Sequence, residues 1–261
     1  MISKPNKLTK ISQNIRNSVI KMAYLSKTGE TGSSLSIIEI LTVLYFKILK
    51  IDPKNLCSRD RDIFILSKGH GAAALYATLA EKGIMSKEKL ESYRINGGNL
   101  HGHPCKNKNP EIEVSSGSLG HGLSIGAGMS LVLPAKRKVY VLIGDGECNE
   151  GSIWEAAMFI GRKKLPVVAI IDFNNFQGFG KATEMNPFSL KKQWQSFGWE
   201  VLETDGHDTD KLEGALKSAQ KSKLPTVVIA KTIIGKGVPK IENLLKAHYF
   251  VPDEETFNNI K

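Results

Sequence analysis

The 261-residue sequence has few cysteines, few arginines and no long apolar run. Cys57, Cys105 and Cys148 form no C-x-x-C pair, which argues against a disulfide framework and against a structural zinc site. No run of about 18 apolar residues occurs, so no segment is expected to span a membrane. The N-terminal stretch MISKPNKLTKISQNIRNS lacks an apolar core and a cleavage site, so it does not predict a secretory signal, and a cytoplasmic location is expected.

The scarcity of arginine also limits what the net charge of +10 can mean, because only six residues are arginine and the excess is lysine scattered along the chain. Arginine is the usual reader of phosphates and bases, and aromatic residues do not interleave with the basic ones. The charge is therefore interpreted as a solvated surface, and no nucleic-acid partner is expected.

What the sequence does contain is an alternation of helical and strand patterns. Apolar residues recur at helical spacing over 11–22 and 37–45, and Ser36 with Glu39 and Ser152 with Glu155 match the capping-box pattern of helix starts. Short apolar runs predict buried strands at 62–66, 139–143, 167–172, 199–204 and 226–230. The alternation predicts an α/β fold with a mostly parallel, twisted sheet and helices on both faces, and residues 1–261 are expected to form a single domain.

Two of the predicted strands end in polar residues. Asp145 follows the strand 139–143 within G-D-G, and the adjacent Asn174 and Asn175 follow the strand 167–172. Because a crossover helix makes these strands parallel, we expect both ends to meet at one edge of the sheet, where open α/β sheets bind ligands. Carboxylate, amide and backbone carbonyl oxygens suit Mg²⁺, and Gly144 and Gly146 let the backbone approach a ligand closely. The pattern predicts a magnesium site there.

The whole unit, GDG, a helix, and a second strand ending in DFNN, resembles the thiamine diphosphate motif. GDGECNEGSIWEAAMFI in particular resembles the transketolase family. Other segments are similar to successive parts of the diphosphate-binding half of transketolase, from Ile37 to about Tyr249; they are SLSIIEILTVLYF, LSKGHGAAALYATLAEKG, HGHP, SSGSLGHGLSIGAGMSL and GKGVPKIENLLKAHY. The resemblance implies a thiamine diphosphate-binding fold.

The resemblance also implies a cofactor set and a ligand set. Thiamine diphosphate is expected with Mg²⁺, or with Ca²⁺ or Mn²⁺ in its place. Asp145 and Asn174 would be side-chain ligands of the metal, and the backbone carbonyl of Phe176 would be a third. If the register shifts by one residue, Asn175 and the carbonyl of Gln177 replace the last two.

Three histidines match positions that line the channel to the reactive carbon of the coenzyme. His70, His103 and His248 are expected to hold diphosphate oxygens or sugar hydroxyls, and to shuttle protons, because imidazole titrates near neutrality. Glu150 matches a carboxylate at the interface between active-site halves. His121 stands where glutamine is common and is a further candidate. The remaining coenzyme contacts implied by the resemblance are Gly117, Ser118, Leu119, Gly144, Gly146 and Glu147.

The sequence departs from the family pattern in two ways. The family usually has histidine where Glu30 stands, and a carboxylate neither donates like an imidazole nor tolerates a phosphorylated sugar nearby. The chain also stops at Lys261, before the pyrimidine-binding domain whose glutamate activates the coenzyme. We therefore expect the N-terminal subunit of a split transketolase, in an α2β2 assembly with a C-terminal subunit that carries that domain.

The expected activity is transfer of a two-carbon ketol unit from a ketose donor to an aldehyde or ketone acceptor, with sugars or sugar phosphates as substrates. Two alternatives stay open. One is another thiamine diphosphate enzyme, such as a dehydrogenase component or a specialised carboligase. The other is a noncatalytic module that binds Mg²⁺ and a diphosphate, although such a module would not need the three channel histidines.

Overall fold

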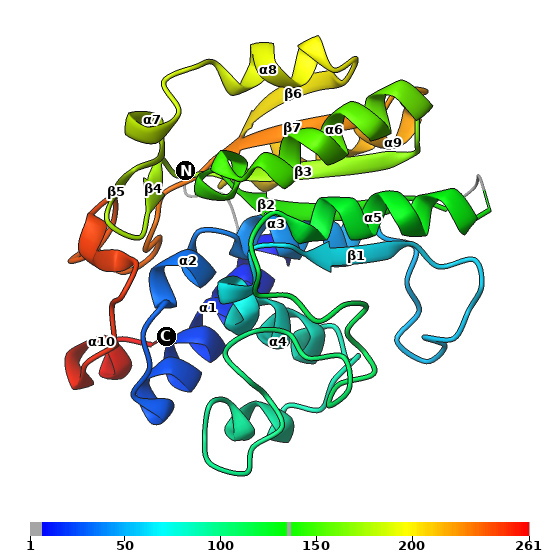
Figure 1. The fold of residues 1–261 in the computed structure, drawn as a ribbon. Coiled ribbons are helices and arrows are strands. Elements are labelled where there is room, and N and C mark those ends of the chain that lie inside the picture. The colour runs from blue at the N-terminus through cyan, green and yellow to red at the C-terminus, as the bar shows by residue number, and fades with distance from the viewer. Residues whose placement is uncertain (1–6, 135–136, 261) are drawn as a thin grey trace, which may run out of the picture.

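The computed structural model describes residues 7–134 and 137–260, and its centre is a five-stranded sheet (Figure 1). The strand order is β1-β2-β3-β7-β6, and every neighbouring pair is parallel. The strands are β1 (Ile63–Leu66), β2 (Val139–Gly144), β3 (Val167–Phe173), β6 (Glu200–Asp205) and β7 (Thr226–Lys231). The predicted α/β class and all five predicted strands are confirmed. Parts of the predicted domain 1–261 and of its N-terminal stretch lie outside the described residues.

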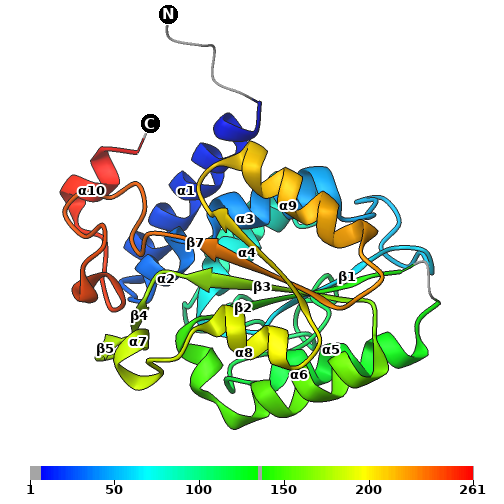
Figure 2. The ribbon, with the colours of Figure 1, turned by 90° about the horizontal axis from the view of Figure 1, so that it is seen from above.

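Helices cover both faces of the sheet, as Figure 2 shows. One face carries α1 (Lys7–Ser26), α3 (Ile38–Val43), α4 (Ala72–Glu81) and α9 (Thr209–Lys221). The other carries α5 (His121–Val132), α6 (Gly151–Lys163) and α8 (Leu190–Ser196). The shorter helices are α2 (Thr31–Leu35), α7 (Ala182–Met185) and α10 (Glu254–Asn258). Among the described helices, none is long and apolar enough to cross a bilayer.

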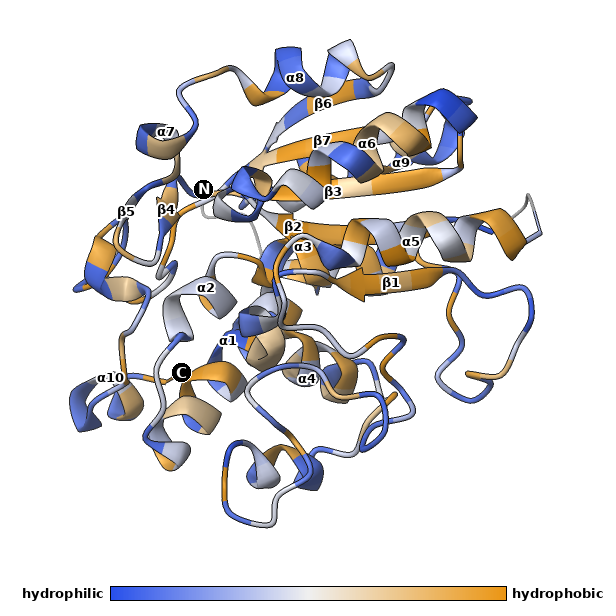
Figure 3. Ribbon diagram, viewed as in Figure 1, coloured by the Kyte–Doolittle hydropathy of each residue, from blue (hydrophilic) through white to orange (hydrophobic). Residues whose placement is uncertain are grey.

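The core consists of two apolar layers that the central strands separate. In β2 all six residues are buried, and successive side chains point to opposite faces. Tyr140 and Leu142 pack into the layer beneath α1, α3, α4 and α9, whereas Val139, Val141 and Ile143 pack into the layer beneath α5 and α6. The hydrophobic colouring of β1, β2, β3 and β7 in Figure 3 reflects this burial. The strands therefore read as continuous apolar runs.

Both predicted capping boxes are wrong. The helix α3 begins at Ile38 without a side-chain cap, and Ser36, at the end of α2, donates instead to the carboxylate of Asp172. The helix α6 begins at Gly151, also without a side-chain cap, although Ser152 and Glu155 lie in its first two turns. Tertiary hydrogen bonding and packing replace the local capping pattern at both positions.

A small antiparallel hairpin was not predicted. Its strands are β4 (Phe176–Gln177) and β5 (Gly180–Lys181), and it projects from the end of β3 beyond the main sheet (Figure 1). The strands are only two residues long, too short to leave a periodic pattern in the sequence. The hairpin matters because its residues form one side of the pocket described below.

Close packing of α6 yields a stability prediction. A Cβ at Gly161 would lie 1.8 Å from the carbonyl oxygen of Phe197, whereas a Cβ at Gly214, within α9, would meet no atom within 4 Å. Gly161→Ala is therefore expected to lower the free energy of unfolding by about 1–3 kcal/mol through overpacking. The matched control Gly214→Ala should raise it by up to about 1 kcal/mol. Urea titration measures both, and equal effects of the two substitutions would contradict the packing argument.

Candidate active site

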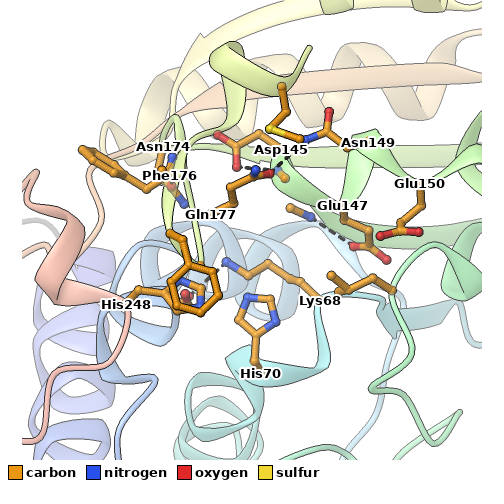
Figure 4. Close-up of a pocket in the computed structure, with 18 of the residues that line it drawn as sticks. Lys68, His70, Asp145, Glu147, Asn149, Glu150, Asn174, Phe176, Gln177 and His248 are labelled. Atoms are coloured by element: carbon orange, nitrogen blue, oxygen red, sulfur yellow. Dashed lines mark hydrogen bonds between the residues drawn. The ribbon is translucent and has the colours of Figure 1, made fainter.

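A pocket of about 760 Å³ lies at the carboxyl edge of the sheet, where β2 and β3 end (Figure 4). The strand ends, the turn after β1, the hairpin β4–β5 and the segment around His248 all contribute to its walls. The predicted residues that line it are His70, His103, Gly117, Leu119, Gly144, Asp145, Gly146, Glu147, Glu150, Asn174, Phe176 and His248. Chain segments that are far apart in the sequence therefore meet here as expected.

Asp145 is held at the end of β2 by backbone hydrogen bonds. Its Oδ1 accepts from the N–H of Gly146 at 2.8 Å, and its Oδ2 accepts from the N–H of Asn175, which follows β3. The side chain is buried. Burial, with the neighbouring Asp172 carboxylate, raises the pKa of Asp145 to about 7. The two strand ends are thus in direct contact at this carboxylate.

The adjacent amides, Asn174 and Asn175, point to different places. Asn174 is buried and lines the pocket; its Nδ2 donates to Asp172 at 3.0 Å, and its Oδ1 accepts from the N–H of Phe176 at 2.9 Å. Asn175 has a left-handed backbone (φ 63°), and its Oδ1 accepts from the N–H of Thr183 at 3.2 Å. The geometry therefore favours Asn174 over Asn175 as a side chain that faces a ligand in the pocket.

Lys68 is a pocket residue that the sequence analysis did not single out. Its side chain is 2% exposed, and its Nζ donates to the carboxylate of Asp172 and to the carbonyl of Ser33, the latter at 3.1 Å. It stands two residues before His70 in the SKGHG segment, so its position in that motif was the one signal that could have identified it. The ammonium also lines the pocket, which makes it a candidate donor to a ligand anion.

The charges at the strand ends suit a divalent cation. Asp145, Glu147 and Asp172 are buried carboxylates, and Lys68 is a buried cation beside them. In the part of the chain that the structure describes, no cluster of three His, Cys, Asp or Glu side chains could hold a metal. A cation would depend on amide and carbonyl oxygens beside a carboxylate, the donor set that Mg²⁺ accepts. Asp145, Asn174 and the Phe176 carbonyl fit this chemistry.

The three predicted histidines converge on the pocket with different surroundings. The rings of His70 and His248 are 5.7 Å apart, and His103 lies against Gly69, where a Cβ would approach its ring to 3.0 Å. Burial and the nearby Lys68 ammonium hold the pKa of His70 well below its usual value, and they lower the pKa of His248 as well. Both rings are therefore neutral at neutral pH. Among the described residues, the buried Nδ1 of His248 has no hydrogen-bond partner, so it is free to bind a ligand.

Glu147 is engaged by the protein itself. It accepts hydrogen bonds from the N–H of Gly120 at 2.8 Å, from the N–H of Gly144 at 3.2 Å and from the Ser67 hydroxyl. Burial raises its pKa. This carboxylate fixes the loop before α5 against the end of β2, so its place in the pocket wall is mainly structural.

Other predicted positions lie outside the pocket or at its edge. Glu150 is exposed at the rim, where it precedes α6. Ser118 is exposed and is not among the lining residues, so the pocket lends no support to its predicted contact. His121, the first residue of α5, is exposed and likewise does not line the pocket. His207 binds Glu39 through Nδ1 at 2.9 Å, as expected for a structural histidine.

A parallel sheet with such a pocket at its carboxyl edge defines an open α/β protein that binds its ligand there. Within that class, the chain belongs to the transketolase family, because the model of the transketolase thiamine diphosphate-binding domain matches residues 8–261. The resemblance seen in the sequence and the expected coenzyme-binding fold are confirmed, and the coenzyme of this domain is thiamine diphosphate.

Curated relatives include components of two-part enzymes. One component of the apulose-4-phosphate transketolase of Actinobacillus succinogenes is 42% identical over 254 residues, which cover 95% of this chain and 92% of that protein. The 6-deoxy-6-sulfo-D-fructose transketolase subunit SqwG of a Clostridium species is 41% identical over 233 residues, or 87% of this chain and 85% of that protein.

Solved transketolases share the fold. The transketolase of Campylobacter jejuni aligns with a TM-score of 0.87 and 30% identity, covering 97% of this chain and 42% of that one. The transketolase of Leishmania mexicana aligns with a TM-score of 0.91 and 26% identity, covering 99% and 41%. The chain thus spans about two fifths of these transketolase chains.

The raised pKa of Asp145 predicts a pH dependence for the cation-free protein. Its pKa rises from an ordinary 3.8 to about 7 on folding, so the folded state favours the protonated carboxyl. This contribution to stability is fully present below the unfolded pKa and is lost as the pH rises through the folded one. In EDTA, the thermal midpoint should fall between about pH 5 and about pH 8, and Asp145→Asn should flatten this change. A midpoint that rises over this range in the wild type, relative to Asp145→Asn, would contradict the assignment.

Proposed function

We propose that the chain is the coenzyme-binding subunit of a two-subunit transketolase that transfers a two-carbon ketol unit between sugars. The observation that carries this proposal is the meeting of Asp145, Asn174 and three histidines in one pocket at the carboxyl edge of the sheet. A noncatalytic binding module would need the oxygen ligands but not the histidines. The histidines therefore favour an enzyme.

In this proposal the strand ends hold the diphosphate through Mg²⁺, or through Ca²⁺ or Mn²⁺ in its place. Asp145 and Asn174 supply side-chain oxygens, and Phe176 supplies its carbonyl. The coenzyme, when bound, supplies the electron sink for cleaving a carbon–carbon bond. Lys68 places its ammonium at the pocket floor, where it can donate to an anionic oxygen.

The neutral histidines bind and position the sugar. His70 and His248 lie side by side, and His103 faces the same pocket from the loop before α5. A neutral imidazole both donates and accepts, so these rings can bond sugar hydroxyls and move a proton at a ring nitrogen, such as the unpartnered Nδ1 of His248. Water exclusion would require a cover over the open side of the pocket.

That cover is proposed to be a second, C-terminal subunit that carries the pyrimidine-binding domain. Two relatives matched over most of their length are named as transketolase subunits, which supports the two-part arrangement. Large apolar side chains are exposed near the pocket, as a partner surface requires: Phe179 is 91% exposed, Phe188 71% and Met185 68%. Glu150 at the rim would face this partner. Closed symmetry favours two copies of each subunit, an α2β2 assembly.

Sugars or sugar phosphates are the proposed substrates. The relatives are named for a phosphorylated and for a sulfonated sugar, so the family accommodates an anionic group on the substrate. The substrate of this chain is to be decided by activity measurements on the assembled enzyme. The cytoplasmic location expected from the sequence stays a prediction.

Metal and coenzyme binding can be tested by substitution at the strand ends. Asp145→Ala and Asn174→Ala are each expected to lower the affinity for thiamine diphosphate in Mg²⁺ at least about tenfold, because each removes an oxygen ligand. Asn175→Gly is the matched control, since glycine keeps the left-handed backbone and this side chain faces Thr183. Calorimetric titration of the subunit with its partner measures all three. If Asn175→Gly weakens binding more than Asn174→Ala, the ligand is Asn175.

The two-subunit proposal predicts that this chain alone does not transfer ketol groups, because no described residue of its pocket covers the open side. Adding the product of the neighbouring gene, if that product carries a pyrimidine-binding domain, should restore turnover in the presence of thiamine diphosphate and Mg²⁺. Obligate complexes of this kind bury well over about 2,000 Å². Ultracentrifugation and a ketol-transfer assay on the separate and mixed chains decide it, and robust turnover by the lone chain would refute the split arrangement.

A further inference from the structure

An ion pair between Glu30 and Arg94 lies at the wall of the pocket. Glu30 is among the lining residues, together with the three histidines, and Arg94 Nη1 donates to its Oε2 at 3.0 Å. The side chains are 25% and 31% exposed. This pair is only partly screened by solvent, unlike an ion pair on an open surface.

The position of Glu30 is fixed by the chain on both sides of it. Its backbone is left-handed, with φ 66°. A Cβ at Gly29 would lie 2.9 Å from the carbonyl oxygen of Tyr249, and a Cβ at Gly32 would lie 2.2 Å from that of Ala247. The start of α2 therefore packs flush against the segment that carries His248. Burial lowers the pKa of His248 and the charge of Glu30 acts in the opposite direction, which reflects how near the carboxylate is.

Arg94 approaches from the other wall and is equally well held. Its N–H donates to the carbonyl of Leu100 at 2.7 Å, and its guanidinium lies against Gly102, where a Cβ would be 3.1 Å from Cζ. The next residue is His103. The ion pair thus joins the segment that carries His248 to the segment that carries His103, and it fixes a carboxylate between them.

The chemistry of the pair restricts what can bind beside it. An ionised carboxylate accepts hydrogen bonds but cannot donate them. The bond to Arg94 uses only Oε2, and among the described residues no further donor to Glu30 is found. A ligand group at this wall must therefore be a donor, such as a hydroxyl. A phosphate, sulfonate or carboxylate oxygen placed there would meet a like charge that Arg94 offsets but does not remove.

We propose that Glu30 determines substrate specificity by accepting a hydrogen bond from a hydroxyl next to the reacting carbonyl of the sugar, and that Arg94 positions this carboxylate. The proposal rests on the proposed ketol transfer. It narrows the expectation drawn from the sequence, which treated Glu30 as an unpaired charge. Exclusion of anionic groups is now local to the wall between His103 and His248, and an anionic group farther along the substrate is not affected.

The test uses the holoenzyme, meaning this chain with its partner subunit, thiamine diphosphate and Mg²⁺. Erythrulose serves as a neutral donor, and three small acceptors differ at one place: glycolaldehyde carries a hydroxyl, propionaldehyde a methyl group and glyoxylate a carboxylate. Wild type should prefer glycolaldehyde in kcat/KM. Glu30→Ala should reduce kcat/KM for glycolaldehyde about tenfold more than for propionaldehyde, because a hydrogen bond to a charged group is lost. Glu30→Gln should raise the relative use of glyoxylate.

Arg94 is tested as a positioning residue. Arg94→Met should weaken the preference for glycolaldehyde over propionaldehyde and disfavour glyoxylate further, because the carboxylate is then neither held nor balanced. Arg94→Lys should restore part of the preference. Thermal midpoints and coenzyme affinities like those of wild type show that the variants fold.

Three outcomes decide the matter. Equal losses for glycolaldehyde and propionaldehyde in Glu30→Ala would overturn the specificity role, and so would a wild type without preference for glycolaldehyde. Failure of the wild-type holoenzyme to transfer ketol groups to any of the aldehydes, despite coenzyme binding, would refute the proposed function itself and the Glu30 assignment with it. The failures are distinguishable, because only the last removes all activity.

Discussion

The buried carboxylate of Asp172 is the constraint on which the rest of the site depends. It is fully buried near the end of β3, and it accepts hydrogen bonds from Ser36 at 2.7 Å, from Asn174 at 3.0 Å, and from Lys68 and Thr232. These donors come from the end of α2, the turns after β1 and β3, and the end of β7. A buried charge is tolerated only when it is paired and fully hydrogen-bonded. Satisfying this one carboxylate therefore brings four separate segments together at the carboxyl edge of the sheet.

The same carboxylate shapes the chemistry of the pocket. Because the Nδ2 of Asn174 donates to Asp172, the amide oxygen is turned the other way, toward the N–H of Phe176 and the candidate metal position. After burial, Asp172 is the largest cause of the raised pKa of Asp145. Lys68 is already bound to Asp172 and leaves the charge of Asp145 without an equal partner. The fold thus creates a local need for a cation at the strand ends, and a bound Mg²⁺ would meet it.

Much of the fold and part of the site could be predicted because they follow from local patterns and one general rule. Apolar runs marked the five strands, and the rule that crossover connections make strands parallel placed Asp145 beside Asn174, where the structure finds them. The contacts of Lys68 with Asp172 and of Arg94 with Glu30 could not be predicted in this way, because they join residues 104 and 64 positions apart and leave no periodic signal. The predicted capping boxes were wrong for a related reason: distant partners outcompeted the local ones.

The two ion pairs near the pocket differ in burial, and this difference separates what the fold requires from what specificity requires. The side chains of Lys68 and Asp172 are 2% and 0% exposed, so loss of either partner leaves a buried charge unpaired, which is strongly destabilising. Those of Arg94 and Glu30 are 31% and 25% exposed, so solvent can screen whichever partner remains after a substitution. The pocket floor therefore tolerates little change, whereas the wall can change at little cost to folding. In a protein of this architecture, substrate preference can diverge at the wall while the coenzyme site stays fixed.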